Sequence, residues 1–217
     1  MENNNNNNRF SSFSVPLGLL DYVNPIFYSI TIITVIRNTY SSMDMPFNVM
    51  LLIGAIISVF FGFIIPTGKV IVGLGLIQFR MPVSLVFCVN TGILISGLML
   101  LKYVMNMSAA AICILIATIV LLLVLIYAKS RKINSIAVLT GAAGYLMLYT
   151  SLIALSVRDG VMAPITMYAV AILLFVMLCG IGIKADLKNP EVHWVIEISN
   201  VVCQGLVAAA TVLLFST

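Results

Sequence analysis

Polar side chains recur on one side of an otherwise apolar stretch, residues 192–215. His193, Glu197, Asn200 and Gln204 follow one another at intervals of four, three and four residues. On a helix with 100° between successive residues, these four and Thr211 fall within an arc of about 60°. Lipid cannot satisfy such groups, so this face should point into a helical bundle or toward a water-filled cavity.

A second polar face lies near the start of the chain. Asp21, Asn24, Tyr28, Thr31 and Asn38 span an arc of about 100° on a helix. The polar groups of both faces avoid lipid most easily if the two faces turn toward one another. The sequence therefore predicts a cytoplasm-accessible cavity that binds a small polar or cationic solute, as in a transporter or channel-like protein. The predicted binding residues are Glu197, Asn200, Gln204, Asp21, Asn24 and Tyr28, with Asn90 as a further lining amide and His193 as a proton-sensitive gate.

Three other interpretations of the polar face stay open. Asn, Gln and Thr side chains also hold membrane helices together, and Glu197 could simply pair with Lys69 or Arg80. The face could dock a partner helix, which would make the protein a non-catalytic membrane subunit or sensor. It could also serve an interfacial lipid-modifying enzyme, with Glu197 and His193 as acid and base.

The composition identifies the surroundings of these faces. Hydrophobic residues make up 62% of the 217 residues, charged residues 8%, and the mean hydropathy is +1.17. Soluble domains carry about 25% charged residues. The chain is therefore predicted to be an all-α, polytopic integral membrane bundle in contact with the lipid bilayer.

Apolar stretches of about 20 residues, the length needed to span a bilayer, indicate about seven transmembrane helices. We expect residues 1–15 to form a disordered Asn-rich tail and residues 16–217 a single domain. The predicted spans lie near 18–37, 47–66, 82–102, 108–128, 134–157, 163–183 and 192–215.

Lysine and arginine predict the orientation, because cytoplasmic loops carry an excess of them. Eight of these residues fall on the side of the N-terminus and three on the opposite side. The N-terminus is therefore predicted to be cytoplasmic and the C-terminus external, in a multi-pass protein of the plasma (cytoplasmic) membrane.

The segment 67–80 has no clear place in this scheme. Pro66 is expected to end the second span, and the apolar residues after it are too few for another crossing. An interfacial linker is the favoured interpretation, with a re-entrant piece or an extension of the third span as alternatives.

Small residues predict close helix packing on the second span. Gly54, Ser58 and Gly62 recur every four residues and form a ridge for helix contact, either within the chain or in a homo-oligomer or with a membrane partner protein.

Several chemistries find no support in the sequence. His193 is the only histidine, and the four cysteines stand in apolar stretches, so no metal site is predicted. No G-x-S-x-G, Walker A, GxGxxG or CxxC motif occurs. We therefore expect no catalytic residues, no cofactor and no nucleic-acid partner, although an enzyme stays among the alternatives.

Overall fold

The computed structural model describes residues 14–76, 82–130, 133–184 and 190–216. These residues form α-helices joined by short connections, with one short 3-10 helix and no strand among them. The predicted all-α class is confirmed. The elements are α1 (Val15–Asp21), α2 (Val23–Thr39), η1 (Tyr40–Ser42), α3 (Phe47–Gly73), α4 (Val83–Met105), α5 (Ala109–Ser130), α6 (Ile133–Arg158), α7 (Ala163–Lys184) and α8 (Pro190–Leu214).

Apolar length supports a multi-pass membrane protein. Five segments of the described chain are long and apolar enough to span a bilayer, and two shorter apolar helices accompany them. The first of the five, Val15–Ser42, contains α1 and α2, so these two short helices make one crossing. Most of the predicted tail, residues 1–13, lies outside the described residues.

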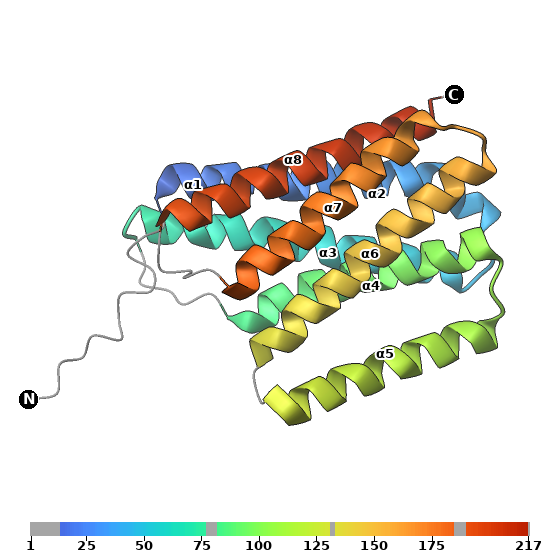
Figure 1. Ribbon diagram of the computed structural model, residues 1–217, viewed down its shortest axis with the longest axis horizontal. Coiled ribbons are helices and arrows are strands. Elements are labelled where there is room, and N and C mark those ends of the chain that lie inside the picture. The colour runs from blue at the N-terminus through green and yellow to red at the C-terminus, as the bar shows by residue number, and fades with distance from the viewer. Residues whose placement is uncertain (1–13, 77–81, 131–132, 185–189, 217) are drawn as a thin grey trace, which may run out of the picture.

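Six of the crossings close into a ring. Along the ring, α2 packs on α3, α3 on α4, α4 on α6, α6 on α7, α7 on α8, and α8 returns to α2. Successive crossings run in opposite directions, as Figure 1 shows, so α1 begins and α8 ends at opposite ends of the bundle. Helix α5 lies at the edge of the bundle and packs on α6. The ring therefore brings the first and last crossings of the chain into contact.

Helix α4 makes very close contacts with both of its neighbours. A Cβ atom placed on Gly92 would lie 2.6 Å from the carbonyl oxygen of Gly54 and 2.7 Å from the backbone nitrogen of Ser58 on α3. On the other side of α4, a Cβ atom on Gly144 of α6 would lie 2.7 Å from the backbone nitrogen of Leu94. Because no side chain separates these backbones, dispersion contacts hold the three helices at short range.

The ridge of Gly54, Ser58 and Gly62 is used inside the chain. Gly54 and Ser58 face α4, whereas a Cβ on Gly62 would lie 3.3 Å from the Cβ of Pro25 on α2. Ser58 is buried. The ridge thus packs α3 against both of its neighbours in the ring.

Proline positions explain where several helices begin. Pro46 and Pro82 stand immediately before α3 and α4, and Pro164 and Pro190 lie in the first two residues of α7 and α8. These are places where no intrahelical hydrogen bond needs the missing N–H.

The prediction that Pro66 ends the second span is wrong. Helix α3 continues through Pro66 to Gly73, so residues 67–73 are neither a linker, nor a re-entrant piece, nor part of the third span. The added turns pack on α1, where a Cβ on Gly18 would lie 2.9 Å from the Cγ2 of Val70. This tertiary contact offsets the free-energy cost of an internal proline. Because the helix continues past Pro66, Lys69 lies on α3 and reaches the bundle. Residues 77–81, which include Arg80, lie outside the described residues.

We expect Gly92→Ala to destabilise the protein. The new methyl group would meet backbone atoms that cannot move independently, and overpacking of this kind costs about 1–3 kcal/mol. Gly205→Ala is the matched control, since its Cβ would meet the side chain of Phe27 at 3.1 Å, which can give way. Thermal unfolding in detergent should show a lower Tm for Gly92→Ala alone. Equal Tm values for the two variants would contradict this account of the α3–α4 contact.

Candidate functional site

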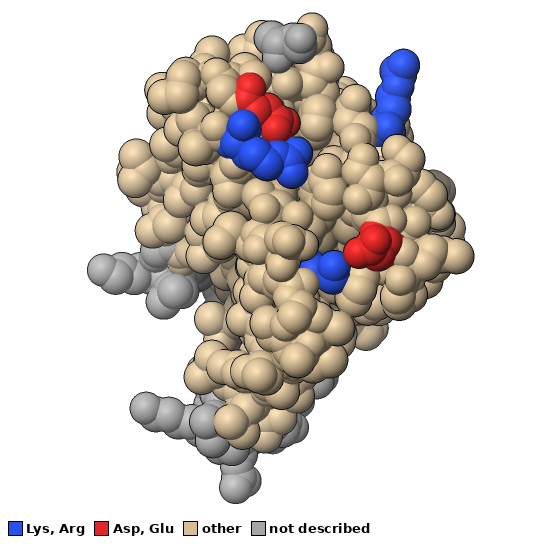
Figure 2. Space-filling view, turned by 90° about the vertical axis from the view of Figure 1, so that its right-hand side faces the viewer, with Lys and Arg blue, Asp and Glu red and all other residues tan. Residues whose placement is uncertain are grey.

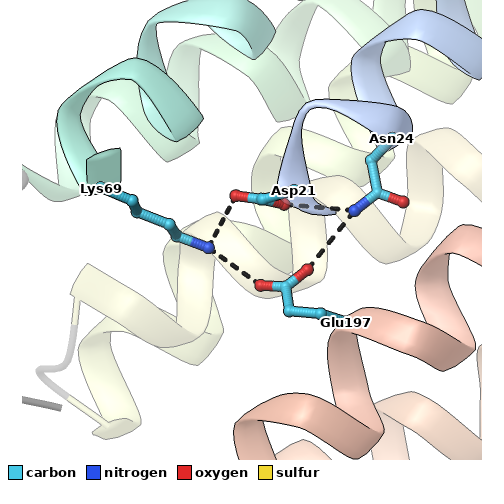
Figure 3. Close-up of polar contacts among 4 residues, drawn as sticks. All are labelled: Asp21, Asn24, Lys69 and Glu197. Carbon is cyan, nitrogen blue, oxygen red and sulfur yellow. Dashed lines mark hydrogen bonds and ion pairs between the residues drawn. The ribbon is translucent and has the colours of Figure 1, made fainter. Parts of the chain in front are cut away.

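One ammonium group joins three helices near the end of the bundle where α1 begins. The Nζ of Lys69 on α3 lies 2.7 Å from the Oδ2 of Asp21, the last residue of α1, and 2.9 Å from the Oε1 of Glu197 on α8 (Figure 3). The side chains of Lys69, Asp21 and Glu197 are 17%, 12% and 11% exposed. Ion pairs so far from water persist only when the partners are close and further hydrogen bonds satisfy their remaining polar atoms.

Asn24 supplies those further hydrogen bonds. Its Nδ2 donates to the Oδ1 of Asp21 at 3.2 Å and to the Oε2 of Glu197 at 3.4 Å. Each carboxylate therefore accepts from Lys69 through one oxygen and from Asn24 through the other. The Oδ1 of Asn24 points away from the other three residues (Figure 3), and this buried atom has no hydrogen-bond partner among the described residues. We call Asp21, Asn24, Lys69 and Glu197 the ionic cluster.

The sequence around Asp21 explains how α1 presents it. Pro25 has no N–H, so the carbonyl oxygen of Asp21 lacks its usual helical donor four residues later. The helix is interrupted at Tyr22, between α1 and α2. The hydroxyl of Tyr22 hydrogen-bonds that of Thr67 on α3 at 2.7 Å and fixes the interrupted turn against the helix that carries Lys69.

A cavity of about 310 Å³ lies inside the ring beside the ionic cluster. Residues from α1, α2, α3, α4, α6, α7 and α8 line it, whereas α5 contributes none. The apolar part of the wall includes Ile65, Val89, Ile93, Val138 and Phe175. The polar lining residues are Asp21, Asn24, Tyr28, Ser58, Asn90, Tyr145, Asn200 and Gln204.

Hydrogen bonds across the ring hold several of these polar groups in place. Ser58 donates through Oγ to the hydroxyl oxygen of Tyr28 at 3.0 Å, joining α3 to α2. Asn90 donates through Nδ2 to the carbonyl oxygen of Ala137 at 2.7 Å, joining α4 to α6. Gln204 donates through Nε2 to the hydroxyl of Tyr149 at 3.1 Å, joining α8 to α6. The wall of the cavity is therefore ordered by its own polar contacts.

The structure brings most of the predicted binding residues together. Asp21, Asn24, Tyr28, Asn90, Asn200 and Gln204 line the cavity. Glu197 does not line it but hydrogen-bonds Asn24, which does. His193 is half-buried one turn before Glu197 and is not among the lining residues. The role of His193 as a gate or proton-sensitive group stays a prediction.

Sequence reasoning missed Lys69 as a member of the predicted site. The residue entered only as one of two possible partners of Glu197, because the second span was expected to end at Pro66. Ser58 and Tyr145 also line the cavity. The spacing of Ser58 with Gly54 and Gly62 had indicated helix packing, and it does both, since its Oγ reaches Tyr28 while its backbone lies against α4.

The opposite end of the bundle is different in character. Figure 2 shows the face on which α8 ends, where charged groups are few and scattered over an uncharged surface. Arg158 and Asp159 form an ion pair of 2.9 Å there, but their side chains are 45% and 38% exposed. Among the described residues, charges buried in the bundle are thus found at the end where α1 begins.

Fold and site together define a multi-pass helical membrane protein with a polar cavity and a buried ionic cluster. A scan against protein-family models gives no match, and no curated protein and no solved structure is detectably similar. No three or more His, Cys, Asp or Glu side chains of the described residues gather as transition-metal ligands would.

Removing the ammonium group should be costly. Lys69→Met would leave two buried carboxylates without their cation, and breaking a buried ion pair from one side costs about 3–5 kcal/mol. The matched control is Arg158→Met, because an exposed pair of this kind contributes about 0–1 kcal/mol. Unfolding in detergent should show a much larger loss for Lys69→Met. Similar losses for both variants would show that the cluster is not a buried structural unit.

Proposed function

We propose that this protein is a membrane transporter that binds a small polar or cationic solute inside its helical ring. The observation that carries the proposal is the cavity of about 310 Å³ with polar groups from five crossings in its wall. Its volume is at the lower end of the range of roughly 300–1,000 Å³ that is usual for small-molecule pockets. A bundle that needed only helix contacts would have little reason to keep this volume beside so many amides and hydroxyls.

The chemistry of the wall favours a neutral polar or cationic solute over an anion. Amides such as those of Asn90, Asn200 and Gln204 both donate and accept hydrogen bonds, so they suit hydroxyl, amide or ammonium groups. Asp21 is the one charged residue of the described lining, and it is negative. Lys69 contacts the carboxylates of the cluster and is not in the lining, so it does not offer an anion a free partner.

Access should come from the end where α1 begins, which the distribution of Lys and Arg predicts to be cytoplasmic. The other half of the ring is filled by fully buried side chains, among them Leu152, Leu155 and Val207. Tyr168 and Thr211 hydrogen-bond each other there at 3.0 Å. We infer a carrier that must rearrange to release its solute rather than an open pore. That this membrane is the plasma membrane stays a prediction.

Docking of a partner helix on the polar face of α8 gains little support from the packing. The polar groups of that face already contact other helices of the same chain, with Glu197 on Lys69 and Asn24, and Gln204 on Tyr149.

The cavity should be reachable by water-soluble thiol reagents. In a background without Cys88, Cys113, Cys179 and Cys203, we expect Asn200→Cys to react with an impermeant reagent added from the side on which α1 begins. Val202→Cys is the control, because this neighbouring position is 50% exposed on the outer surface of α8 and should face lipid. Labelling of neither position would argue that the cavity is dry. Equal labelling of both would contradict the assignment of position 200 to the cavity and position 202 to lipid.

Solute uptake should depend on the wall amides. In proteoliposomes, a panel of small organic cations, neutral polyols and small carboxylates should yield at least one cationic or neutral solute that is taken up. Asn200→Ala should reduce its uptake about tenfold, since one bound polar group then loses its partner. Val202→Ala should leave uptake unchanged. The proposal fails if no solute is taken up, or if Asn200→Ala and Val202→Ala behave alike in folded protein.

A further inference from the structure

Two prolines leave backbone carbonyls without their helical donors in the wall of the cavity. Pro25 cannot donate to the carbonyl oxygen of Asp21, and Pro66 cannot donate to that of Gly62, four residues earlier in each case. Asp21, Pro25, Gly62 and Pro66 all line the cavity. Gly62 has no side chain, so the atoms it contributes to the wall belong to its backbone.

The two turns that lack a backbone hydrogen bond, at Pro25 and at Pro66, lie against one another. A Cβ atom on Gly62 would be 3.3 Å from the Cβ of Pro25, which places the turn of α3 before Pro66 beside the turn of α2 that contains Pro25. Inside a bilayer, carbonyl groups freed by proline persist where they meet a donor, water or a cation. Discontinuous helices of transporters use such carbonyl oxygens to coordinate monovalent cations near the solute.

A third oxygen, with no hydrogen-bond partner among the described residues, stands next to these turns. The Oδ1 of Asn24 is buried and accepts no hydrogen bond from the described residues, while its Nδ2 is held by the two carboxylates of the ionic cluster. Turning the amide over would break both of those bonds, so the oxygen is fixed in its position. A buried acceptor without a donor is a usual sign of a bound water or ion.

The charge of the cluster indicates what kind of ligand is missing. Among the described residues, two carboxylates, Asp21 and Glu197, share the single ammonium group of Lys69. With both carboxylates ionised, the cluster carries one net negative charge in a region with little access to water, where an uncompensated charge costs much free energy. One further monovalent cation would restore neutrality, whereas a divalent cation would leave an excess positive charge.

We propose that Asp21, Asn24 and Gly62 form a binding site for an alkali-metal cation, with the backbone carbonyl of Asp21, the Oδ1 of Asn24 and the backbone carbonyl of Gly62 as oxygen ligands. This proposal rests on the proposed transport function in one respect. The cation would bind beside the solute, and its gradient across the membrane would drive solute uptake. The carboxylates of the ionic cluster attract the cation from a short distance, and the positive charge of Lys69 weakens that attraction.

The site can be tested without any solute. The purified full-length protein in detergent should show a Tm that rises with NaCl or KCl and saturates, compared with choline chloride at the same chloride concentration, because a ligand that binds the folded state stabilises it. Choline is too large for a site formed by two neighbouring helix turns. Because choline could instead enter the solute cavity, NaCl or KCl should raise the Tm further when it is added to protein already saturated with choline. Equal Tm values in the three salts would overturn the proposal, and so would a dependence on pH alone, which would assign the cluster a proton instead.

Pro66→Ala is the most selective variant, because it changes no polar side chain. It supplies an N–H that can donate to the carbonyl of Gly62 and so removes one ligand. We expect the alkali-cation concentration at half-maximal stabilisation to rise at least about tenfold, as for loss of a supporting group at a metal site. Asn24→Leu should have a similar effect through loss of Oδ1.

Pro164→Ala is the matched control. Pro164 is the second residue of α7, where no helical hydrogen bond is missing, so the cation dependence of the Tm should not change. An unchanged response in Pro66→Ala and Asn24→Leu would overturn the assignment of the ligands. Stabilisation by the cation without uptake of any solute would instead keep the site and reject the transport function.

Discussion

The two ion pairs of Lys69 are the interaction on which the arrangement of the bundle most depends. The Nζ of Lys69 lies 2.7 Å from the carboxylate of Asp21 and 2.9 Å from that of Glu197. These contacts hold the end of α1, the end of α3 and the start of α8 together. These helices come from the first, second and last crossings of the chain, so the contact helps to close the ring. Since none of the three charges is tolerable alone at this depth, each constrains where the other two lie.

The closed ring and the cavity have a common physical origin. Glycines bring α3, α4 and α6 to backbone contact on one side, where Gly92 and Gly144 leave no room for a side chain. On the other side, Pro25 and Pro66 interrupt regular hydrogen bonding at turns that line the cavity. Large side chains such as Tyr28 and Tyr145 hold hydroxyls in the wall between these two regions. Tight packing near one wall and irregular backbone near another leave a polar space inside an apolar bundle.

Much of this could be predicted from the sequence. Composition gave the membrane class, and helical periodicity placed Asp21, Asn24, Tyr28, Asn200 and Gln204 on two faces that line the same cavity. Lys69 was named as one possible partner of Glu197, and this ion pair is found. Its place on α3 was not predicted, because local rules make Pro66 a helix end, whereas contacts such as that of Val70 with Gly18 stabilise the longer helix. His193 shares the arc of Glu197 but lies one turn nearer the start of α8, and periodicity alone does not tell how far the cavity extends along the axis. The two polar faces did lead us to expect the first and last crossings to face one another, and α2 and α8 are in contact. The order of the other helices around the ring is a long-range feature that spacing within single helices does not contain.

The central claim is that Lys69 and its two carboxylates act as one electrostatic unit beside the cavity. A double-mutant cycle tests it most directly, with the free energy of unfolding measured for Lys69→Met, for Asp21→Asn with Glu197→Gln, and for all three substitutions together. Because the combined variant leaves no unpaired charge, we predict that it will be more stable than Lys69→Met alone. The coupling free energy should be about 0.5–3 kcal/mol. Purely additive losses would contradict the account and would mean that the three side chains stabilise the bundle independently.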